Sequence, residues 1–348
     1  MGLVLDILND IRGQIAVDDT VLKEAKDRRN LVVKAALGID GARGSFRSGS
    51  AAHGTVNAPV TDADAGIVLD RRTYPALGPD GDGDGPEDIV DALCELIGPV
   101  VRDDYPGAKM RRSRRGVYVT FASPLDDDQD PTVDLIPTLD RKDADGLWIP
   151  DLDNGDWSPS HPEEHTALFT SGSKELRALR ARVTRLAKAW NKQWATGNRA
   201  VSSFNIEALV WEYVDDDALA LGLDGALAGW FAYSRAELDK GRTKDPAGVS
   251  DDIKLLLTKD TVLQRIGGAA DRLDEALKAD AEGDEDKVRD LLSGVYRDYV
   301  DAPTESKSAL AAALRGGNEG IGATASGIAV AAGKPLKTTR SFGGERDG

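Results

Sequence analysis

Two aspartates at the start of an aliphatic run place the strongest constraint on what this chain can fold into. The stretch "DADAGIVLD" (62–70) puts Asp62 and Asp64 one residue apart, just before the strand-like run from Ile67 to Leu69. Residues two apart in a strand face the same side, so both carboxylates point together, with Cα atoms about 6.5–7 Å apart. Burying two like charges without a partner is costly. The stretch therefore predicts either an exposed strand edge or a pair of acids that bridge divalent cations about 3.5–4 Å apart.

A Gly-Ser turn before this strand favours the cation-binding interpretation. Gly49 and Ser50 precede Asp62 with residues 51–61 between them, and glycine allows a close approach of the backbone to a ligand. The letters "SAAHG", which begin at Ser50, can form a short helix whose first N–H groups face a phosphate. Alone, Gly-Ser is an ordinary tight turn, but its combination with the two acids predicts a nucleotide site.

A third acid is expected on a neighbouring strand. The strand signals "VYVTFA" (117–122) and "TVDLIP" (132–137) are separated by the polar segment "DDDQDP", which favours a hairpin. Asp134 lies in the second strand between two aliphatic residues that point the other way, so it either faces solvent or joins the first two acids. The candidate catalytic and metal-binding residues are Asp62, Asp64 and Asp134.

The hydrophobic periodicity changes along the chain. The first part has a long helix at 18–37, a helix with Pro86 in its first turn, the strands above and an irregular stretch at 141–171. Beyond Ser171 the pattern is helical almost throughout. The predicted helices are 173–195, 203–214, 218–239, 250–278, 284–300 and 303–315. A glycine-rich end with few large side chains predicts a flexible tail. The predicted regions are therefore a mixed α/β part at 1–170, a helical domain at 171–315 and a tail at 316–348.

Composition limits the classes of partner. The 348 residues carry a formal net charge of −16, so long nucleic acid is not expected as a substrate except at a local basic patch. The stretch 109–115 is such a patch, which either binds a partner or balances nearby acids at a strand edge. Cys94 is the one cysteine, and His53, His161 and His165 are too scattered in sequence to suggest a zinc site. No membrane-length apolar run and no signal-peptide pattern are present, which predicts a cytoplasmic protein.

The order of these motifs resembles a known enzyme family. A Gly-Ser turn, eleven residues, Asp-x-Asp before an aliphatic run and a third acid on a neighbouring strand are similar to the polymerase-β-like nucleotidyltransferase superfamily. "VDLIPTL", followed by "LWIPDLDNGDWSPSHPEEHTALF", narrows the resemblance to the CD-NTases, the bacterial relatives of cyclic GMP–AMP synthase and of DncV. "RLAKAWNKQ" and "AVSSFNIEALV" resemble that family's K-x-W-N and S-(aromatic)-x-x-E motifs. The resemblance runs from about Gly44 to Trp211 and includes the long helix. It implies an α+β, bilobal fold: a nucleotidyltransferase core with a mixed sheet and helices, and a C-terminal helical lobe.

The resemblance also implies roles for single residues. Gly49 and Ser50 would hold the β- and γ-phosphates of the donor, Lys188 and Ser203 would contact its triphosphate, and the three aspartates would hold two Mg²⁺, with Mn²⁺ as an alternative. Read without the family, Lys188 lies opposite the apolar stripe of its helix and is either solvated or faces a cleft. Ser203 is either a helix cap, a phosphate ligand or both. Many relatives carry an acid or a bulky residue near the end of the Asp-x-Asp run, where this chain has Ala65 and Gly66. Gly66 lies on the carboxylate face and leaves space.

The implied activity is synthesis of a cyclic di- or oligonucleotide second messenger from ATP or other NTPs by two-metal catalysis. The implied setting is bacterial antiphage signalling (CBASS), with a downstream cyclic-nucleotide effector. Terminal Gly348 is either part of an ordinary disordered tail or a site for E1/E2-like conjugation machinery. Two other functions stay open at this point: a nucleotidyltransferase that modifies tRNA or protein, and a catalytically silent nucleotide-binding scaffold.

Overall fold

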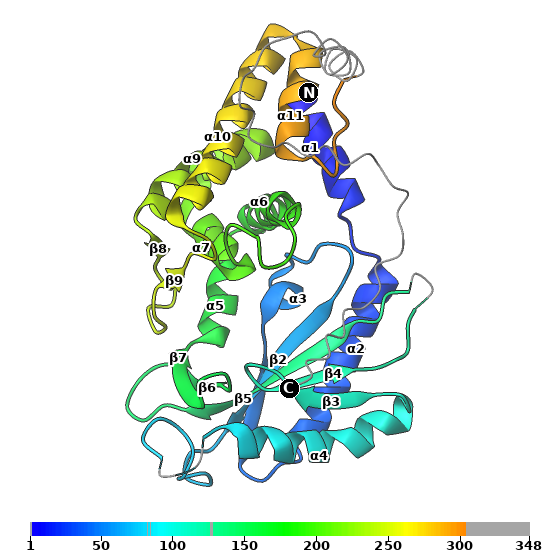
Figure 1. Cartoon of the computed structure of the whole chain (residues 1–348), viewed down its shortest axis with the longest axis vertical. Coiled ribbons are helices and arrows are strands. Elements are labelled where there is room, and N and C mark those ends of the chain that lie inside the picture. The colour runs from blue at the N-terminus through cyan, green and yellow to red at the C-terminus, as the bar shows by residue number, and fades with distance from the viewer. Residues whose placement is uncertain (1, 82, 84, 126–127, 304–348) are drawn as a thin grey trace, which may run out of the picture. The chain divides into compact units, whose positions relative to one another are not determined.

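A seven-stranded mixed sheet organises the part of the chain up to residue 160 in the computed structural model, which describes residues 2–303 except 82, 84, 126 and 127 (Figure 1). Its strands are β1 (Ala42–Arg47), β2 (Asp62–Leu69), β3 (Lys109–Arg112), β4 (Val117–Thr120), β5 (Thr132–Asp140), β6 (Leu147–Asp151) and β7 (Asp156–Ser160). The main order is β1-β2-β5-β4-β3, and β6 pairs with β5 and β7. Only β2 and β5 pair in parallel among these strands. The predicted hairpin is confirmed, because β4 and β5 pair in antiparallel register.

Two helices cover one face of this sheet. α2 (Asp19–Ala36) begins after Asp18, whose carboxylate accepts the N–H groups of Thr20 and Val21, so the helix predicted at 18–37 is confirmed. α4 (Glu87–Asp104) follows Pro86, as predicted. Both helices pack on the strands through a cluster that we call the sheet core. Its buried residues include Val32, Ile67, Leu93, Val117 and Leu135.

The stretch predicted to be irregular, 141–171, is instead ordered into β6, β7 and α5 (Pro162–Phe169), so that prediction is wrong. Prolines weakened the strand signal, since proline cannot donate to a sheet ladder. In the structure the two prolines of β6 and β7 each lie opposite a tryptophan: Trp148 pairs with Pro159, and Pro150 pairs with Trp157. Cross-strand packing therefore outweighs local propensity here.

Helices dominate beyond residue 171. They are α6 (Lys174–Lys192), α7 (Ser203–Tyr213), α8 (Asp216–Ala220), α9 (Gly222–Asp239), α10 (Lys259–Glu282) and α11 (Glu285–Val295). The helix predicted at 218–239 is divided at Gly222, whose φ of +76° lies in the left-handed region. The helix predicted at 250–278 starts only at Lys259, because residues before it form β9 (Ile253–Lys254), which pairs with β8 (Arg242–Thr243).

The sequence analysis did not predict the first helix, α1 (Leu3–Gln14). Its residues Val4, Leu8 and Ile11 are fully buried against α6 and the later helices, in a cluster that we call the helical core. Other members of the helical core are Val183, Leu186, Trp190, Trp230 and Leu273. The carboxylate of Asp280 accepts the N–H groups of Leu3 and Val4 at 2.9 and 3.1 Å. Since this cap comes from the other end of the chain, local sequence carries no signal for it.

The chain up to Pro303 forms one compact unit that holds both cores. The predicted division at residue 170 remains a prediction. The helix α1 packs with the helices that follow residue 170. The helix predicted at 303–315 lies almost wholly outside the described residues, and so do the tail 316–348 and Gly348. Within the described part of the chain, no helix is both long and apolar enough to cross a membrane.

Candidate nucleotide-binding site

The three predicted acids lie on the two parallel strands. Asp62 and Asp64 share one face of β2, while the alanines between and after them are buried on the other face. The register of β2 and β5 places Asp64 directly beside Asp134. On its other side, Asp134 accepts a hydrogen bond of 2.8 Å from the hydroxyl of Ser113. Strand pairing thus brings together acids that are 70 residues apart in sequence (134 − 64).

This acid cluster carries more negative charge than its surroundings offset. Burial, reinforced by the carboxylates of Asp62 and Asp134, raises the pKa of Asp64 to about 8. Burial also raises the pKa of Asp134. Among the described residues, no three His, Cys, Asp or Glu side chains are gathered into a group that could hold a metal ion. The donor chemistry nevertheless fits a hard divalent cation, because carboxylate oxygens are the ligands that Mg²⁺ prefers and its charge would offset theirs.

The predicted Gly-Ser turn lies against these acids. Gly49 begins the short helix α3 (Gly49–His53) with a φ of +72°, and a Cβ built on it would lie 1.9 Å from Oδ2 of Asp64. Any side chain at this position would therefore be strained and would collide with the carboxylate. Glycine is required here by the approach of the turn to Asp64, which explains why the two motifs occur together in the sequence.

Phe46 fills the space that the sequence analysis expected above Gly66. The two residues face each other across β1 and β2, and a Cβ on Gly66 would lie 2.1 Å from the Phe46 ring. The departure from the family pattern at Gly66 therefore accommodates an aromatic ring and does not open a pocket.

A cavity of about 400 Å³ unites the predicted site residues. Those that line it are Gly49, Ser50, Asp62, Asp64, Lys188 and Ser203. Asp134 is not among the lining residues and lies beside Asp64 on the neighbouring strand β5. The strand β2 supplies the two lining acids and α3 supplies the turn residues, whereas α6 and α7 supply the lysine and the serine. The structure thus brings six of the seven predicted residues to one cavity.

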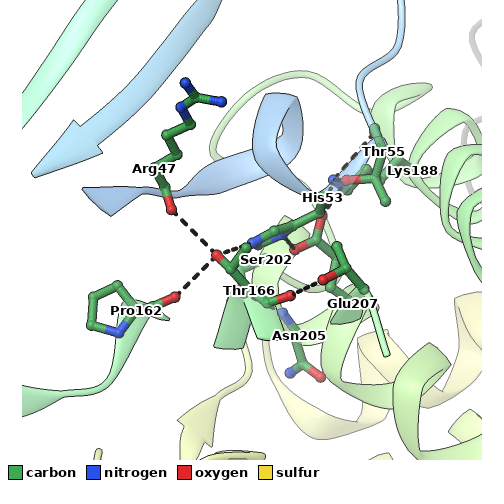
Figure 2. A network of polar contacts seen from close by, with 10 residues as sticks. Arg47, His53, Thr55, Pro162, Thr166, Lys188, Ser202, Asn205 and Glu207 are labelled. Carbon is green, nitrogen blue, oxygen red and sulfur yellow. Dashed lines mark hydrogen bonds and ion pairs between the residues drawn. The ribbon is translucent and has the colours of Figure 1, made fainter. Parts of the chain in front are cut away.

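Lys188 is buried in a polar network that joins the turn region to the helices (Figure 2). Its ammonium donates to Oε1 of Glu207 at 2.6 Å, to the Thr55 hydroxyl at 3.0 Å and to the Thr55 carbonyl at 3.4 Å. His53, the last residue of α3, lies 2.8 Å from Oε2 of Glu207 through Nδ1. Lys188 is therefore not a solvated lysine. It faces the cavity, as the second sequence interpretation expected, and it does so from within a network of protein contacts.

Glu207 holds this network together. Burial alone would raise the pKa of Glu207, but Lys188 and His53 more than offset burial and hold the pKa at about 2. An ionised carboxylate only accepts hydrogen bonds, so Nδ1 of His53 carries the hydrogen. The other ring nitrogen lies 3.1 Å from the hydroxyl of Thr166, which also contacts the carbonyl of Arg47 at 3.3 Å (Figure 2). The network therefore extends from α7 to the end of β1.

Ser202, and not Ser203, caps α7. The Ser202 hydroxyl accepts the N–H of Asn205 at 3.0 Å, whereas Ser203 is the first residue of the helix and is exposed along the cavity. The capping role that the sequence left open for Ser203 therefore belongs to Ser202, and the role of Ser203 as a phosphate ligand stays a prediction. Phe204 follows Ser203 on the cavity wall, with its ring 4.8 Å from that of His165.

Sequence reasoning missed several cavity residues: His53, His165, Lys192, Arg199, Phe204 and Glu207. His53 and His165 were considered in the sequence only as zinc ligands, yet each contacts a carboxylate. His165 lies 2.5 Å from Asp245, 80 residues away, and burial lowers the pKa of His165 despite that partner. The glutamate at the end of the S-(aromatic)-x-x-E motif was the one available signal for Glu207.

The basic stretch 109–115 is balanced by nearby acids, as one of the two sequence interpretations predicted. Arg112 on the edge strand β3 pairs with Asp91, and Arg114 pairs with Asp151 at 2.8 Å. These arginines are therefore already engaged within the chain.

Comparison with known proteins gives one matching domain family and several similar folds. Residues 16–171 match the Second Messenger Oligonucleotide or Dinucleotide Synthetase domain (SMODS). The CD-NTase CdnG of Bradyrhizobium diazoefficiens in complex with GTP is 14% identical, with 85% of this chain and 96% of that chain covered at a TM-score of 0.62. CdnC of E. coli MS115-1 with ATP is 19% identical, with 80% and 91% covered at 0.56. The 3'-deoxy ATP bound form of Vibrio cholerae DncV is 14% identical, with 84% and 93% covered at 0.57. Among the curated proteins, no sequence matches this chain significantly.

Proposed function

We propose that this chain, whose residues 16–171 match the synthetase domain and whose fold is similar to those of CdnC and CdnG, is a nucleotidyltransferase of the CD-NTase type. It joins nucleoside triphosphates into a cyclic di- or oligonucleotide. One observation carries the proposal. A single cavity gathers the Gly49–Ser50 turn, the acids of β2 and the polar groups of α6 and α7. These are the parts that hold a triphosphate beside a group of catalytic acids.

The proposed chemistry is attack by a ribose hydroxyl on the α-phosphate of a donor, with pyrophosphate as the leaving group. Asp62, Asp64 and Asp134 would hold two Mg²⁺, or Mn²⁺, whose charge lowers the pKa of the hydroxyl and offsets that of the pyrophosphate. The backbone and hydroxyl of Ser50 bind the donor phosphates opposite Ser203. The ring of Phe204 offers an apolar surface for a base. Positioning and fixed charges supply most of the rate enhancement.

The substrates that we propose are ATP, GTP or both, since CdnC is described with ATP and CdnG with GTP. We place the reaction in bacterial antiphage signalling in the cytoplasm, with an effector that binds the product. Conjugation of Gly348 by E1/E2-like enzymes is a separate part of the proposal. Mass spectrometry of protein expressed with its neighbouring genes tests this conjugation, and a C-terminus that is always free contradicts the conjugation alone.

The reaction is tested by incubating the protein with four labelled NTPs and Mg²⁺ or Mn²⁺. The expected result is a small labelled product that resists phosphatase, because a cyclic phosphodiester has no terminal phosphate. Mass spectrometry then gives its bases and ring size. Transfer of label to RNA or to polypeptide would indicate the modifying enzyme, and NTP binding without pyrophosphate release would indicate the scaffold. The pairing of Arg112 and Arg114 with acids already disfavours long RNA.

A further inference from the structure

The predicted phosphate ligand Lys188 has no free donor. A lysine ammonium has three N–H groups, and those of Lys188 are directed at Glu207, at the Thr55 hydroxyl and at the Thr55 carbonyl. A phosphate oxygen can reach this ammonium only if one of these contacts is given up. Other cations of the cavity are therefore needed to meet the charge of a triphosphate.

Two cations on the wall of the same cavity have no carboxylate partner. Lys192 follows Lys188 by one helical turn on α6, and Arg199 lies in the segment between α6 and α7. Among the described residues, neither forms an ion pair, and the one hydrogen bond of Arg199 is a long contact of 3.5 Å to Thr196. The Nε atom of Arg199 is buried and has no partner. Both side chains are half-buried, so water does not fully solvate these charges.

Lys188, Lys192 and Arg199 line the same cavity, and their charges act on one another. Burial lowers the pKa of Lys192, and the positive charges of Arg199 and Lys188 lower it further. Asp62 acts in the opposite direction but forms no ion pair with Lys192, so the cations are not simply neutralised by the catalytic acids. Holding like charges together on a half-buried wall is unfavourable unless an anion joins them.

The segment that carries Arg199 is fixed to the end of α6. The side-chain oxygen of Asn191 accepts the N–H of Ala200 at 3.1 Å, and its amide donates to the carbonyl of Val201 at 2.7 Å. Asn191 is itself buried. Asn191, the last residue of the K-x-W-N motif, thus orders the residues next to Arg199 before any ligand arrives, which reduces the entropy lost on binding.

We propose that Lys192 and Arg199 form a binding subsite for the polyphosphate tail of the nucleotide, with Asn191 as the positioning residue. The identity of the nucleotide rests on the proposed function, but the subsite itself is defined by its affinity for polyphosphate. A guanidinium matches the geometry of phosphate oxygens through paired N–H groups, and the ammonium adds a point charge. Lys188 then orders the turn through Thr55 and Glu207, while Lys192 and Arg199 meet the phosphates.

Binding of inorganic tripolyphosphate, measured by calorimetry without divalent metal, tests the subsite. The double variant K192Q/R199Q removes two charges from the cavity wall. It is expected to bind tripolyphosphate at least about tenfold more weakly than the wild type, because charge-assisted hydrogen bonds to the phosphate oxygens are lost. The matched control is R235Q/K278Q, which removes two charges from exposed side chains of α9 and α10. Equal affinity in the two double variants would overturn the proposal.

A charge-keeping variant separates recognition from structure. K192R/R199K retains both charges and is expected to recover most of the affinity. If it binds as weakly as K192Q/R199Q, the site does not bind phosphate through these charges, and the proposal is wrong.

The NTP assay tests the proposed function independently of the subsite. A wild type that binds tripolyphosphate but forms no cyclic product contradicts the proposed function alone. A wild type that forms product with a KM unchanged in K192Q/R199Q contradicts the subsite alone.

Discussion

The acid edge of β2 and the polar network on α6 and α7 form opposite walls of one cavity, and their charges are arranged differently. On the sheet side, burial, reinforced by neighbouring carboxylates, raises the pKa of Asp64 to about 8. On the helical side, Lys188 and the hydrogen bond from His53 offset burial and hold the pKa of Glu207 at about 2. Among the described residues, the acids of the first wall form no ion pair, whereas Lys188 and Glu207 on the second wall pair with each other. The charges of the sheet wall therefore lie close together without being offset, while the Lys188–Glu207 network satisfies its own charges and holds its neighbours in place.

Asp64→Asn breaks the first wall and should have the largest effect. We expect turnover to fall about 10³-fold, because metal-assisted charge stabilisation contributes several kcal/mol to the transition state. Folding should persist, since the substitution removes a buried charge without changing the shape of the side chain. Initial rates of pyrophosphate release and thermal unfolding check both parts. Asp91→Asn, at an exposed acid that pairs with Arg112, is the control and should keep full activity.

Glu207→Gln breaks the second wall and should act mainly on stability. Its loss leaves Lys188 without its buried partner, which should lower the free energy of unfolding by roughly 3 kcal/mol. The folded-state pKa of Glu207 lies below its ordinary 4.5, so its contribution is present above about pH 4.5 and is lost as the pH falls toward 2.

Urea unfolding at several pH values measures this contribution. Below pH 4.5 the wild type should lose stability more steeply than Glu207→Gln. Parallel pH profiles for the two proteins would show that Glu207 does not hold the network together.

Two glycines with the same φ of +72° sharpen the contrast between backbone strain and contact with the acids. Gly54→Ala should cost about 1–2 kcal/mol of stability from left-handed strain, because nothing lies within 4 Å of the added Cβ. Gly49→Ala carries the same strain and also displaces Asp64. It should therefore lose activity at least about tenfold beyond Gly54→Ala. Activities that differ by less than twofold would mean that the turn does not position the acid.

Adjacent serines give the smallest effects and divide capping from binding. Ser202→Ala should cost about 1 kcal/mol of stability through loss of the α7 cap, with KM nearly unchanged. Ser203→Ala should change stability by less than about 0.5 kcal/mol and raise the KM for NTP. Denaturant titration and steady-state kinetics on both variants check the pair. The reverse pattern would return the cap to Ser203.

Much of the sheet side followed from sequence because its signals are local. The alternation of β2, the glycine of the turn and the Asp18 cap each depend on a few adjacent residues. The irregular interpretation of 141–171 failed because strand pairing there depends on tryptophan and proline partners across the hairpin. The first helix was missed because its cap is Asp280.

The helical wall was less predictable, since its chemistry depends on partners distant in sequence. Nothing near Lys188 indicates that Thr55 and Glu207 would take all its donors, and His165 finds Asp245 only in the folded chain. The family resemblance implied roles for Lys188 and Ser203, but it did not indicate Lys192 and Arg199, the cavity cations without a carboxylate partner.

By itself the sequence determined that Asp62 and Asp64 share a face, that a glycine turn precedes them and that helices follow. A two-residue strand period and local backbone chemistry suffice for those conclusions. Only the tertiary structure decided that Asp134 lies beside Asp64, that Gly49 contacts the same carboxylate and that Lys188 is engaged by Glu207. Each of those facts depends on strands and helices whose relative positions are set by burial in the two cores, which no local pattern encodes.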